Sequence, residues 1–374
     1  MSMNFKVVLY VLIVHSCYGF FITQARWGLK DTMSSIRWTT CTCNLKITEE
    51  VWATSFIDYS AANEYIYSHY NQSHYFGKDT SVMENLFDAR ESQSTCQNNR
   101  EILQNYGLAL VNSSLQLSNW SNLNDIGESY LPELDRIINL LFPSKQIHCF
   151  WNPMIRGEAY EISRIENNTK TPTANIASMA HIDNDIGAYQ SVDDFLSIID
   201  KNKVQPFRKQ DFADAIIKGN KRFAVVNFWR NIGMAPVTRA PLAILSTEYD
   251  EGEKFQAFPN ASPNMNRSRW YVFPNATRDE VIVFYQYDRL ISQPSDLWHC
   301  AVSLEDDEIG KDNSHNGQVL PRESFDIRAL IVFDEIVPQD VDRYTPSRQM
   351  PLLSFEESGC FCDEQAEKRL LDDG

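Results

Sequence analysis

Two histidines and one aspartate have the spacing of a metal site. His181 and Asp183 lie two residues apart, so on a β-strand both side chains point to the same face. His299 follows Asp183 by 116 residues (299 − 183), within the run LWHCAV. Two histidines and one carboxylate form the facial ligand set of non-haem Fe(II) sites, which leaves metal positions open for a cosubstrate and O₂. Two alternatives stay open, a buried histidine hydrogen-bonded to a nearby aspartate and a zinc site for hydrolysis.

Two arginines follow the second histidine in a mostly apolar strand segment, residues 321–333. Arg322 and Ser324 form an R-x-S pair, and Arg328 has the same strand parity as Arg322. An arginine that points inward needs a carboxylate partner to offset its desolvation. The distal carboxylate of 2-oxoglutarate could bind a guanidinium bidentately, and Arg322 is the favoured partner, with Ser324 as a hydroxyl donor and Arg328 as its rival. An internal ion pair with Glu323 or Asp326 is the alternative.

The segments around these residues predict a mainly β protein with flanking helices. Short runs rich in Val, Ile, Phe and Tyr predict strands at residues 223–229, 242–245, 270–273, 281–285 and 325–333. Many short strands without long intervening helices favour a barrel or a sandwich. One helical face is predicted at Leu131, Leu134, Ile137, Ile138 and Leu141, and a helical insertion at residues 193–218.

Composition, net charge and the order of helical and β-rich segments indicate how the chain is organised and which partners it can bind. The chain has 374 residues, 43% of them hydrophobic, and a formal net charge of −16. An acidic protein of this kind is not expected to bind nucleic acid, because phosphate binding needs a basic face. We expect a presequence at residues 1–43, a helical region at 44–148, the β-rich core at 149–340 and an acidic tail at 341–374.

The N-terminus has the layout of an export signal. One lysine, Lys6, precedes the apolar run at residues 7–14, which is too short to span a bilayer. The segment behind it is rich in Ser and Thr and resembles the second part of the bipartite plastid presequence of diatoms and related algae. We therefore expect a plastid location, with secretion or the ER lumen as the alternative, and no stable membrane span after the presequence is removed.

Several motifs occur in the order of one enzyme family. They are residues 226–232 (VNFWRNI), 240–245 (APLAIL), 269–281 (RWYVFPNATRDEV), 284–288 (FYQYD) and 322–333 (RESFDIRALIVF). This pattern resembles the Fe(II)/2-oxoglutarate-dependent dioxygenases related to gibberellin desaturase and to the cephamycin-pathway methoxylation protein. The resemblance spans about residues 150–335. Two features depart from it: the family's H-T-A-F is His299-Cys300-Ala301-Val302 here, and residues 303–320 are longer and more acidic.

The resemblance implies a double-stranded β-helix (jelly-roll) core and an oxidoreductase that uses Fe(II), 2-oxoglutarate and O₂. His181, Asp183 and His299 match the metal ligands. The candidate cosubstrate residues are Arg322, Ser324, Arg328, Tyr271 and Asn227, and the candidate substrate residues are Arg230, Arg239 and Arg269. For Tyr271, Asn227 and Arg230 a structural role in packing or hydrogen bonding is equally open.

The expected reaction is oxidation of an unactivated C–H bond of a small molecule, with formation of succinate and CO₂. The plastid-type presequence on this family suggests a kainoid synthase, which cyclises a carboxylate-bearing, N-prenylated glutamate. The alternatives are a hydroxylase or desaturase of another specialised metabolite, and a non-catalytic β-barrel that binds a small acid or acts as a lectin-like module.

Overall fold

The structure is a computed structural model that describes residues 14–16, 19–21, 51–58, 81–93, 96–115, 117–158, 170–183, 191–247, 268–290, 297–304 and 321–338. The chain divides into two compact units, Met1–Glu49 and Glu50–Gly374. In the first unit, β1 (Val14–Ser16) pairs antiparallel with β2 (Gly19–Phe21). The rest of the predicted presequence and the whole predicted acidic tail lie outside the described residues. All further description concerns the second unit.

The second unit contains eleven strands among its described residues. They are β3 (Val51–Asp58), β4 (Ser81–Asp88), β5 (Leu108–Asn112), β6 (Lys145–Gly157), β7 (Thr173–Ala174), β8 (Lys221–Asn231), β9 (Leu242–Thr247), β10 (Ser268–Val272), β11 (Glu280–Asp288), β12 (His299–Ala301) and β13 (Glu323–Ile336). The helices are α2 (Ala89–Gln93), α3 (Asn99–Tyr106), α4 (Leu123–Asp125), α5 (Leu131–Leu141), α6 (Val192–Lys201) and α7 (Lys209–Ala213). Two π-helical turns, Ile126–Tyr130 and Asp214–Lys218, precede α5 and follow α7.

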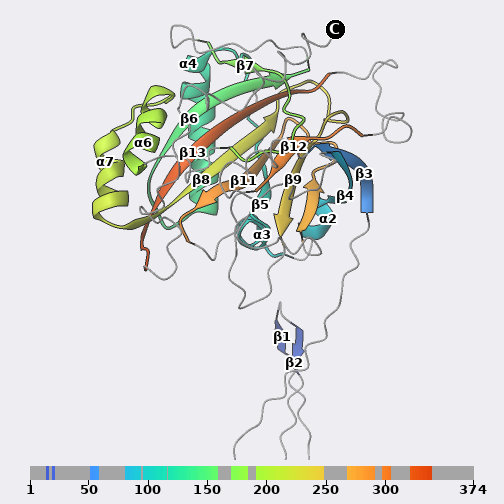
Figure 1. The fold of residues 1–374 in the computed structure, drawn as a ribbon, viewed down its shortest axis with the longest axis horizontal. Coiled ribbons are helices and arrows are strands. Elements are labelled where there is room, and N and C mark those ends of the chain that lie inside the picture. Colours follow the sequence, from blue (N-terminus) through green and yellow to red (C-terminus); the bar gives the residue numbers. More distant parts are fainter. Residues whose placement is uncertain are drawn as a thin grey trace, which may run out of the picture. The chain divides into compact units, whose positions relative to one another are not determined.

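The strands form two sheets that pack on each other (Figure 1). The smaller sheet has the order β12-β9-β10-β4-β3, and the larger sheet has the order β5-β11-β8-β13-β6-β7. Side chains of both sheets share one hydrophobic cluster, in which Ile244 and Tyr271 of the smaller sheet join Trp229 and Phe284 of the larger one. This shared cluster makes the space between the sheets the interior of the protein.

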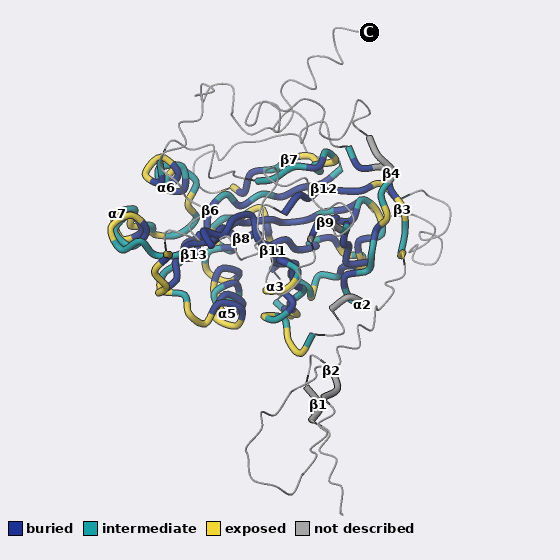
Figure 2. The backbone as a smooth tube through the Cα atoms, turned by 60° about the horizontal axis from the view of Figure 1, so that its bottom comes forward, coloured by how far each residue is buried: buried dark blue, intermediate teal, exposed yellow. Residues whose placement is uncertain are grey.

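The two faces of the larger sheet are covered differently because side chains alternate along each strand. On β8, Val226 and Phe228 face a cluster that includes α5. Val225 of the same strand faces a second cluster, with α6 and α7. Figure 2 shows the central strands buried, whereas α5, α6 and α7 expose their outer faces. Asn227 points to the same face of β8 as Val225 and Trp229, which is the face toward the smaller sheet. The inner face of the larger sheet therefore has a polar centre.

The predicted fold class, mainly β with flanking helices, is confirmed. Each of the five predicted strands lies in or overlaps one of β8, β9, β10, β11 and β13, and the predicted helical face is α5, with all five residues buried. The predicted insertion contains α6, α7 and a π-helical turn. Within residues 44–148 the structure holds helices and also β3, β4 and β5, so this region supplies strands to both sheets. Among the described residues, none belongs to a helix long and apolar enough to cross a membrane.

Candidate metal centre and its pocket

A β-bridge between two chain segments brings the three predicted ligands together. The backbone N–H of His181 donates to the carbonyl of His299 at 3.1 Å, and that of His299 donates to the carbonyl of His181 at 3.0 Å. The ring centroids are 4.3 Å apart. One possible ligand atom from each of His181, Asp183 and His299 lies within 4.8 Å of the others. Residues that are 116 positions apart in sequence therefore converge on one point.

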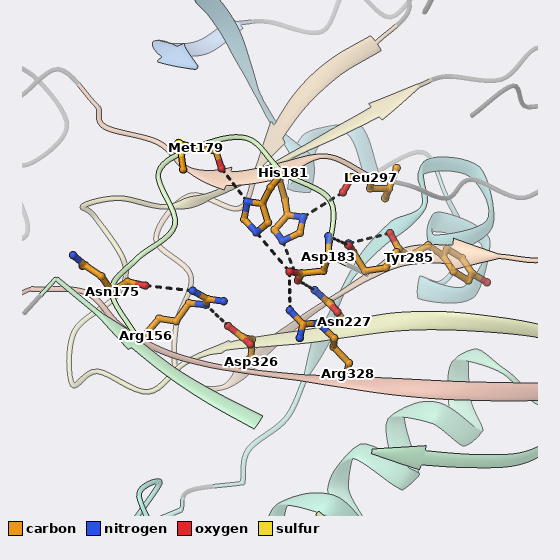
Figure 3. A network of polar contacts seen from close by, with 12 residues as sticks. Arg156, Asn175, Met179, His181, Asp183, Asn227, Tyr285, Leu297, Asp326 and Arg328 are labelled. Carbon is orange, nitrogen blue, oxygen red and sulfur yellow. Dashed lines mark hydrogen bonds and ion pairs between the residues drawn. The ribbon is translucent and has the colours of Figure 1, made fainter. Parts of the chain in front are cut away.

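Both imidazoles direct their Nε2 atoms toward the carboxylate of Asp183. His181 donates its Nδ1–H to the Met179 carbonyl at 2.9 Å, and His299 donates its Nδ1–H to the Leu297 carbonyl at 3.2 Å (Figure 3). A carbonyl only accepts, so in the neutral rings each Nε2 carries a lone pair. The Nε2 atoms lie 3.7 Å (His181) and 3.4 Å (His299) from the Asp183 oxygens.

The charge state of this cluster suits a divalent cation. Burial, with the neighbouring His299 ring, lowers the pKa of His181 to about 4, so this imidazole is neutral at pH 7. Although burial opposes it, the Arg328 guanidinium and the two imidazoles hold the pKa of Asp183 well below its usual range. Two imidazole lone pairs and a carboxylate face one another, which is the donor set that binds Fe(II) and leaves coordination positions open.

The Asp183 ligand is held from the larger sheet. Arg328 Nη2 lies 2.7 Å from Asp183 Oδ1, and Asn227 Nδ2 donates to Asp183 Oδ2 at 2.9 Å. The backbone N–H of Asp183 donates to Gln286 Oε1 at 2.7 Å. Three neighbouring strands, β8, β11 and β13, thus fix the carboxylate through polar side chains on the inner face of the sheet.

Arg322 lines the same pocket but contacts a different set of groups. It is 5% exposed, and it donates to the Ala240 carbonyl and, at 3.3 Å, to Ser324 Oγ. Its guanidinium lies 5.0 Å from the centroid of the Trp229 ring, and its Nε atom is buried without a hydrogen-bond partner. Among the described residues it forms no ion pair. Burial, with the nearby Arg156, lowers the pKa of Arg322 to about 10, which shows that its charge is poorly compensated.

The pocket over the triad has polar and apolar walls. Arg156 and Asp326 form a buried ion pair at 2.7 Å on one side, visible in Figure 3. Trp229, Leu242 and Phe284 supply an apolar wall. Charged and polar side chains therefore converge on the triad beside one apolar wall.

The other predicted site residues lie in different places. Tyr271 is buried in an aromatic group beside Tyr106, with ring centroids 5.9 Å apart. Arg269 lies over the ring of Phe87, with 5.1 Å to its centroid. Arg239 is half exposed and lies 3.4 Å from Glu158, and it lines a second hollow that also reaches Arg322.

Arg230 lies on the opposite face of β8 from Asn227, because the two residues are three positions apart. It donates to Ser113 Oγ at 3.1 Å, to the Ser113 carbonyl at 3.0 Å and to the Arg278 carbonyl at 2.8 Å. It also donates to the Leu115 carbonyl. The structure therefore does not bring Arg230 into the pocket.

Sequence reasoning missed three residues of the site, Gln286, Arg156 and Trp229. Gln286 lies in the FYQYD motif, where a polar residue within a buried strand was a usable signal. Trp229 lies in the VNFWRNI motif. Arg156 ends an apolar strand, and its pairing with Asp326, 170 residues later, is set by the register of β6 and β13.

The fold and the site together define a class: a two-sheet β protein whose interior holds a candidate metal site of two histidines and one carboxylate. A family model described as an oxidoreductase/YMDC permease-like domain matches residues 55–333. The chain belongs to this family, and the three candidate metal ligands lie within the matched residues. A comparison with curated proteins finds no match.

Solved structures of the iron and alpha-ketoglutarate-dependent endoperoxidase NvfI resemble the chain. One covers 68% of this chain and 87% of its own, with 18% identity and a TM-score of 0.46. A second, in a different conformation, covers 68% of this chain and 86% of its own, with 18% identity and a TM-score of 0.47.

Proposed function

We propose that this chain is an Fe(II)/2-oxoglutarate-dependent dioxygenase built on a double-stranded β-helix core. The observation that carries the proposal is one pocket lined by His181, Asp183, His299 and Arg322. Three metal-binding side chains and a buried guanidinium without an ion-pair partner among the described residues supply what a metal-chelating dicarboxylate needs at its two ends.

Bound iron and 2-oxoglutarate would supply the oxidative chemistry, in which O₂ converts 2-oxoglutarate to succinate and CO₂ and a substrate C–H bond is oxidised. His181, Asp183 and His299 would hold the metal. The guanidinium of Arg322, which donates to Ser324 Oγ at 3.3 Å, would bind the distal carboxylate. Trp229, Leu242 and Phe284 exclude water from the reacting centre.

The charge balance of the pocket supports an anionic ligand. Arg156 and Arg322 line the pocket, and Arg328 is paired with the lining residue Asp183. These three positive charges stand against the two carboxylates of Asp183 and Asp326. A divalent metal adds to this excess. In a buried pocket such an imbalance favours a bound dianion, because charges interact strongly where water is excluded.

The substrate proposal is narrower and rests on the sequence. We propose a specialised metabolite that carries a carboxylate, with oxidative cyclisation of an N-prenylated glutamate to a kainoid ring as the first candidate. Arg239 is the best placed of the candidate clamps, because it lines the hollow next to Arg322. Hydroxylation or desaturation of another metabolite is the second candidate.

For localisation we propose a plastid, reached through a bipartite presequence at residues 1–43. The support is the order of a short apolar run, small residues and a Ser/Thr-rich segment. A fluorescent-protein fusion to residues 1–43 tests this proposal, and retention of the fusion in the secretory pathway would contradict it.

The enzymatic proposal is tested by incubation with Fe(II), 2-oxoglutarate, O₂ and a substrate panel that includes N-geranylglutamate. Succinate and the substrate mass are followed, and His299→Ala is the matched control. Loss of two hydrogens indicates cyclisation or desaturation, and gain of one oxygen atom indicates hydroxylation. Folded wild-type protein that forms no more succinate than His299→Ala would contradict the proposal, as expected of a non-catalytic acid-binding protein.

A further inference from the structure

Both oxygens of the Asp183 carboxylate already have a partner within the protein. Oδ1 lies 2.7 Å from Arg328 Nη2, and Oδ2 accepts from Asn227 Nδ2 at 2.9 Å. The same oxygens face the imidazoles of His181 and His299. Each oxygen therefore has one side occupied by an N–H donor and the other side open toward the centre (Figure 3).

The guanidinium of Arg328 forms its ion pair with this carboxylate. Arg328 is 6% exposed, and the ion pair with Asp183 is its one ion pair among the described residues. Its Nε atom is buried without a hydrogen-bond partner, so the rest of the fold does little to hold the group. A buried arginine is retained in such a place only if its partner offsets its desolvation.

Arg322 and Arg328 have separate positions although they are six residues apart and have the same strand parity. Arg322 directly precedes β13, lies near the Trp229 ring and contacts Ala240 and Ser324, and no contact joins it to Asp183. Arg328 lies on β13 and contacts Asp183. The two guanidinium groups therefore have different partners.

We propose that Arg328 is a positioning residue that fixes the orientation of the Asp183 carboxylate for metal ligation, and that it does not anchor the cosubstrate. The inference rests on the proposed function, because it needs a metal at the triad. Arg328 holds one oxygen and Asn227 holds the other, so the plane of the carboxylate is fixed. The open side of each oxygen then faces the imidazoles of His181 and His299.

The test measures Co(II) affinity by calorimetry for the wild type, Arg328→Met and Arg322→Met. Loss of an outer group that orients a metal ligand typically lowers affinity about 10- to 100-fold, which is the loss expected for Arg328→Met. Arg322→Met is the matched control, because it also removes a buried guanidinium close in sequence to Arg328, and it is expected to keep wild-type Co(II) affinity within about twofold.

Two further readouts separate positioning from general damage. Without cosubstrate, the visible spectrum of bound Co(II) is expected to change in Arg328→Met and not in Arg322→Met, because the released carboxylate alters the ligand set. At saturating Co(II), Arg322→Met is expected to lose 2-oxoglutarate affinity and Arg328→Met to keep it.

The conservative variant Arg328→Lys keeps the positive charge without the planar guanidinium, so it is expected to fold and to recover part of the lost Co(II) affinity. If Arg328→Met does not fold, Arg328→Lys carries the test through a several-fold weaker Co(II) affinity.

The outcomes are distinguishable. A wild-type protein that binds no Co(II) would overturn the proposed function. Wild-type Co(II) affinity in the folded Arg328 variants would overturn the positioning role alone, as would an equal loss in Arg322→Met. A selective loss of 2-oxoglutarate affinity in Arg328→Met would make Arg328 a cosubstrate anchor instead.

Discussion

Replacement of Arg322 by methionine removes the guanidinium that we assign to the cosubstrate while keeping a long side chain. In the protein without ligands, the buried charge of Arg322 destabilises the folded state. Burial, as the main cause, lowers its pKa to about 10 from the usual value of an arginine. A shift of that size corresponds to about 3 kcal/mol of unfavourable free energy for the charged form.

Other contacts of Arg322 act in the opposite direction. Its hydrogen bonds to the Ala240 carbonyl and Ser324 Oγ stabilise the fold by about 1 kcal/mol each. Its position 5.0 Å from the Trp229 ring adds about 1 kcal/mol. The two sums nearly cancel, so the free energy of unfolding of Arg322→Met is expected to lie within about 1 kcal/mol of wild type.

Cosubstrate binding is expected to respond far more strongly. Bound 2-oxoglutarate would relieve the uncompensated charge, and a loss of about 3 kcal/mol weakens binding by about 100-fold or more. Chemical denaturation measures the first quantity and anaerobic calorimetry of 2-oxoglutarate on the metal-loaded protein measures the second. A strongly destabilised variant that binds 2-oxoglutarate with wild-type affinity would refute the reasoning.

Three other perturbations follow from contacts away from Arg322. Arg230→Met removes the buried donor of hydrogen bonds to four oxygen acceptors, and denaturation should show that the free energy of unfolding falls by about 3 kcal/mol or more. The 2-oxoglutarate affinity should stay at the wild-type level. An unchanged free energy of unfolding would contradict the structural role of Arg230. Gln286→Leu leaves the Asp183 backbone N–H without its acceptor, and Co(II) affinity should fall about tenfold; equal affinities would show that this contact orients nothing. His148, paired with Asp135 at 2.6 Å, has a pKa lowered by burial, so its stabilising contribution is present above about pH 6.5 and falls as the pH drops toward the folded-state pKa. The stability difference between pH 7 and pH 5 should therefore be smaller in His148→Gln, and identical pH profiles would contradict this.

The strands and α5 could be predicted because local patterns determine them. Runs such as residues 325–333 alternate between two apolar faces, and the five residues of α5 fall on one helical face. The contribution of β3, β4 and β5 to the sheets could not be read in the same way. β4 and β5 pair with β10 and β11, more than 160 residues later, and β3 joins the smaller sheet through β4. The local sequence does not encode such distant partners.

For the site, residue types and spacing predicted the convergence of His181, Asp183 and His299. The different contacts of Arg322 and Arg328 were not predictable, because the two residues have the same strand parity and are both expected on the inner face. Only the three-dimensional register shows that Arg328 faces Asp183 and Arg322 does not. Arg230 illustrates the same limit, since a family motif contains it whichever face of β8 it occupies.

The central claim is that His181, Asp183 and His299 hold one ferrous ion that 2-oxoglutarate chelates. Anaerobic titration of the purified protein with Fe(II) and 2-oxoglutarate tests it directly through the visible metal-to-ligand charge-transfer band. We expect the band to saturate at one equivalent of iron and to be absent in folded His299→Ala. Folded wild-type protein that shows no band, or a band that persists in His299→Ala, would contradict the account.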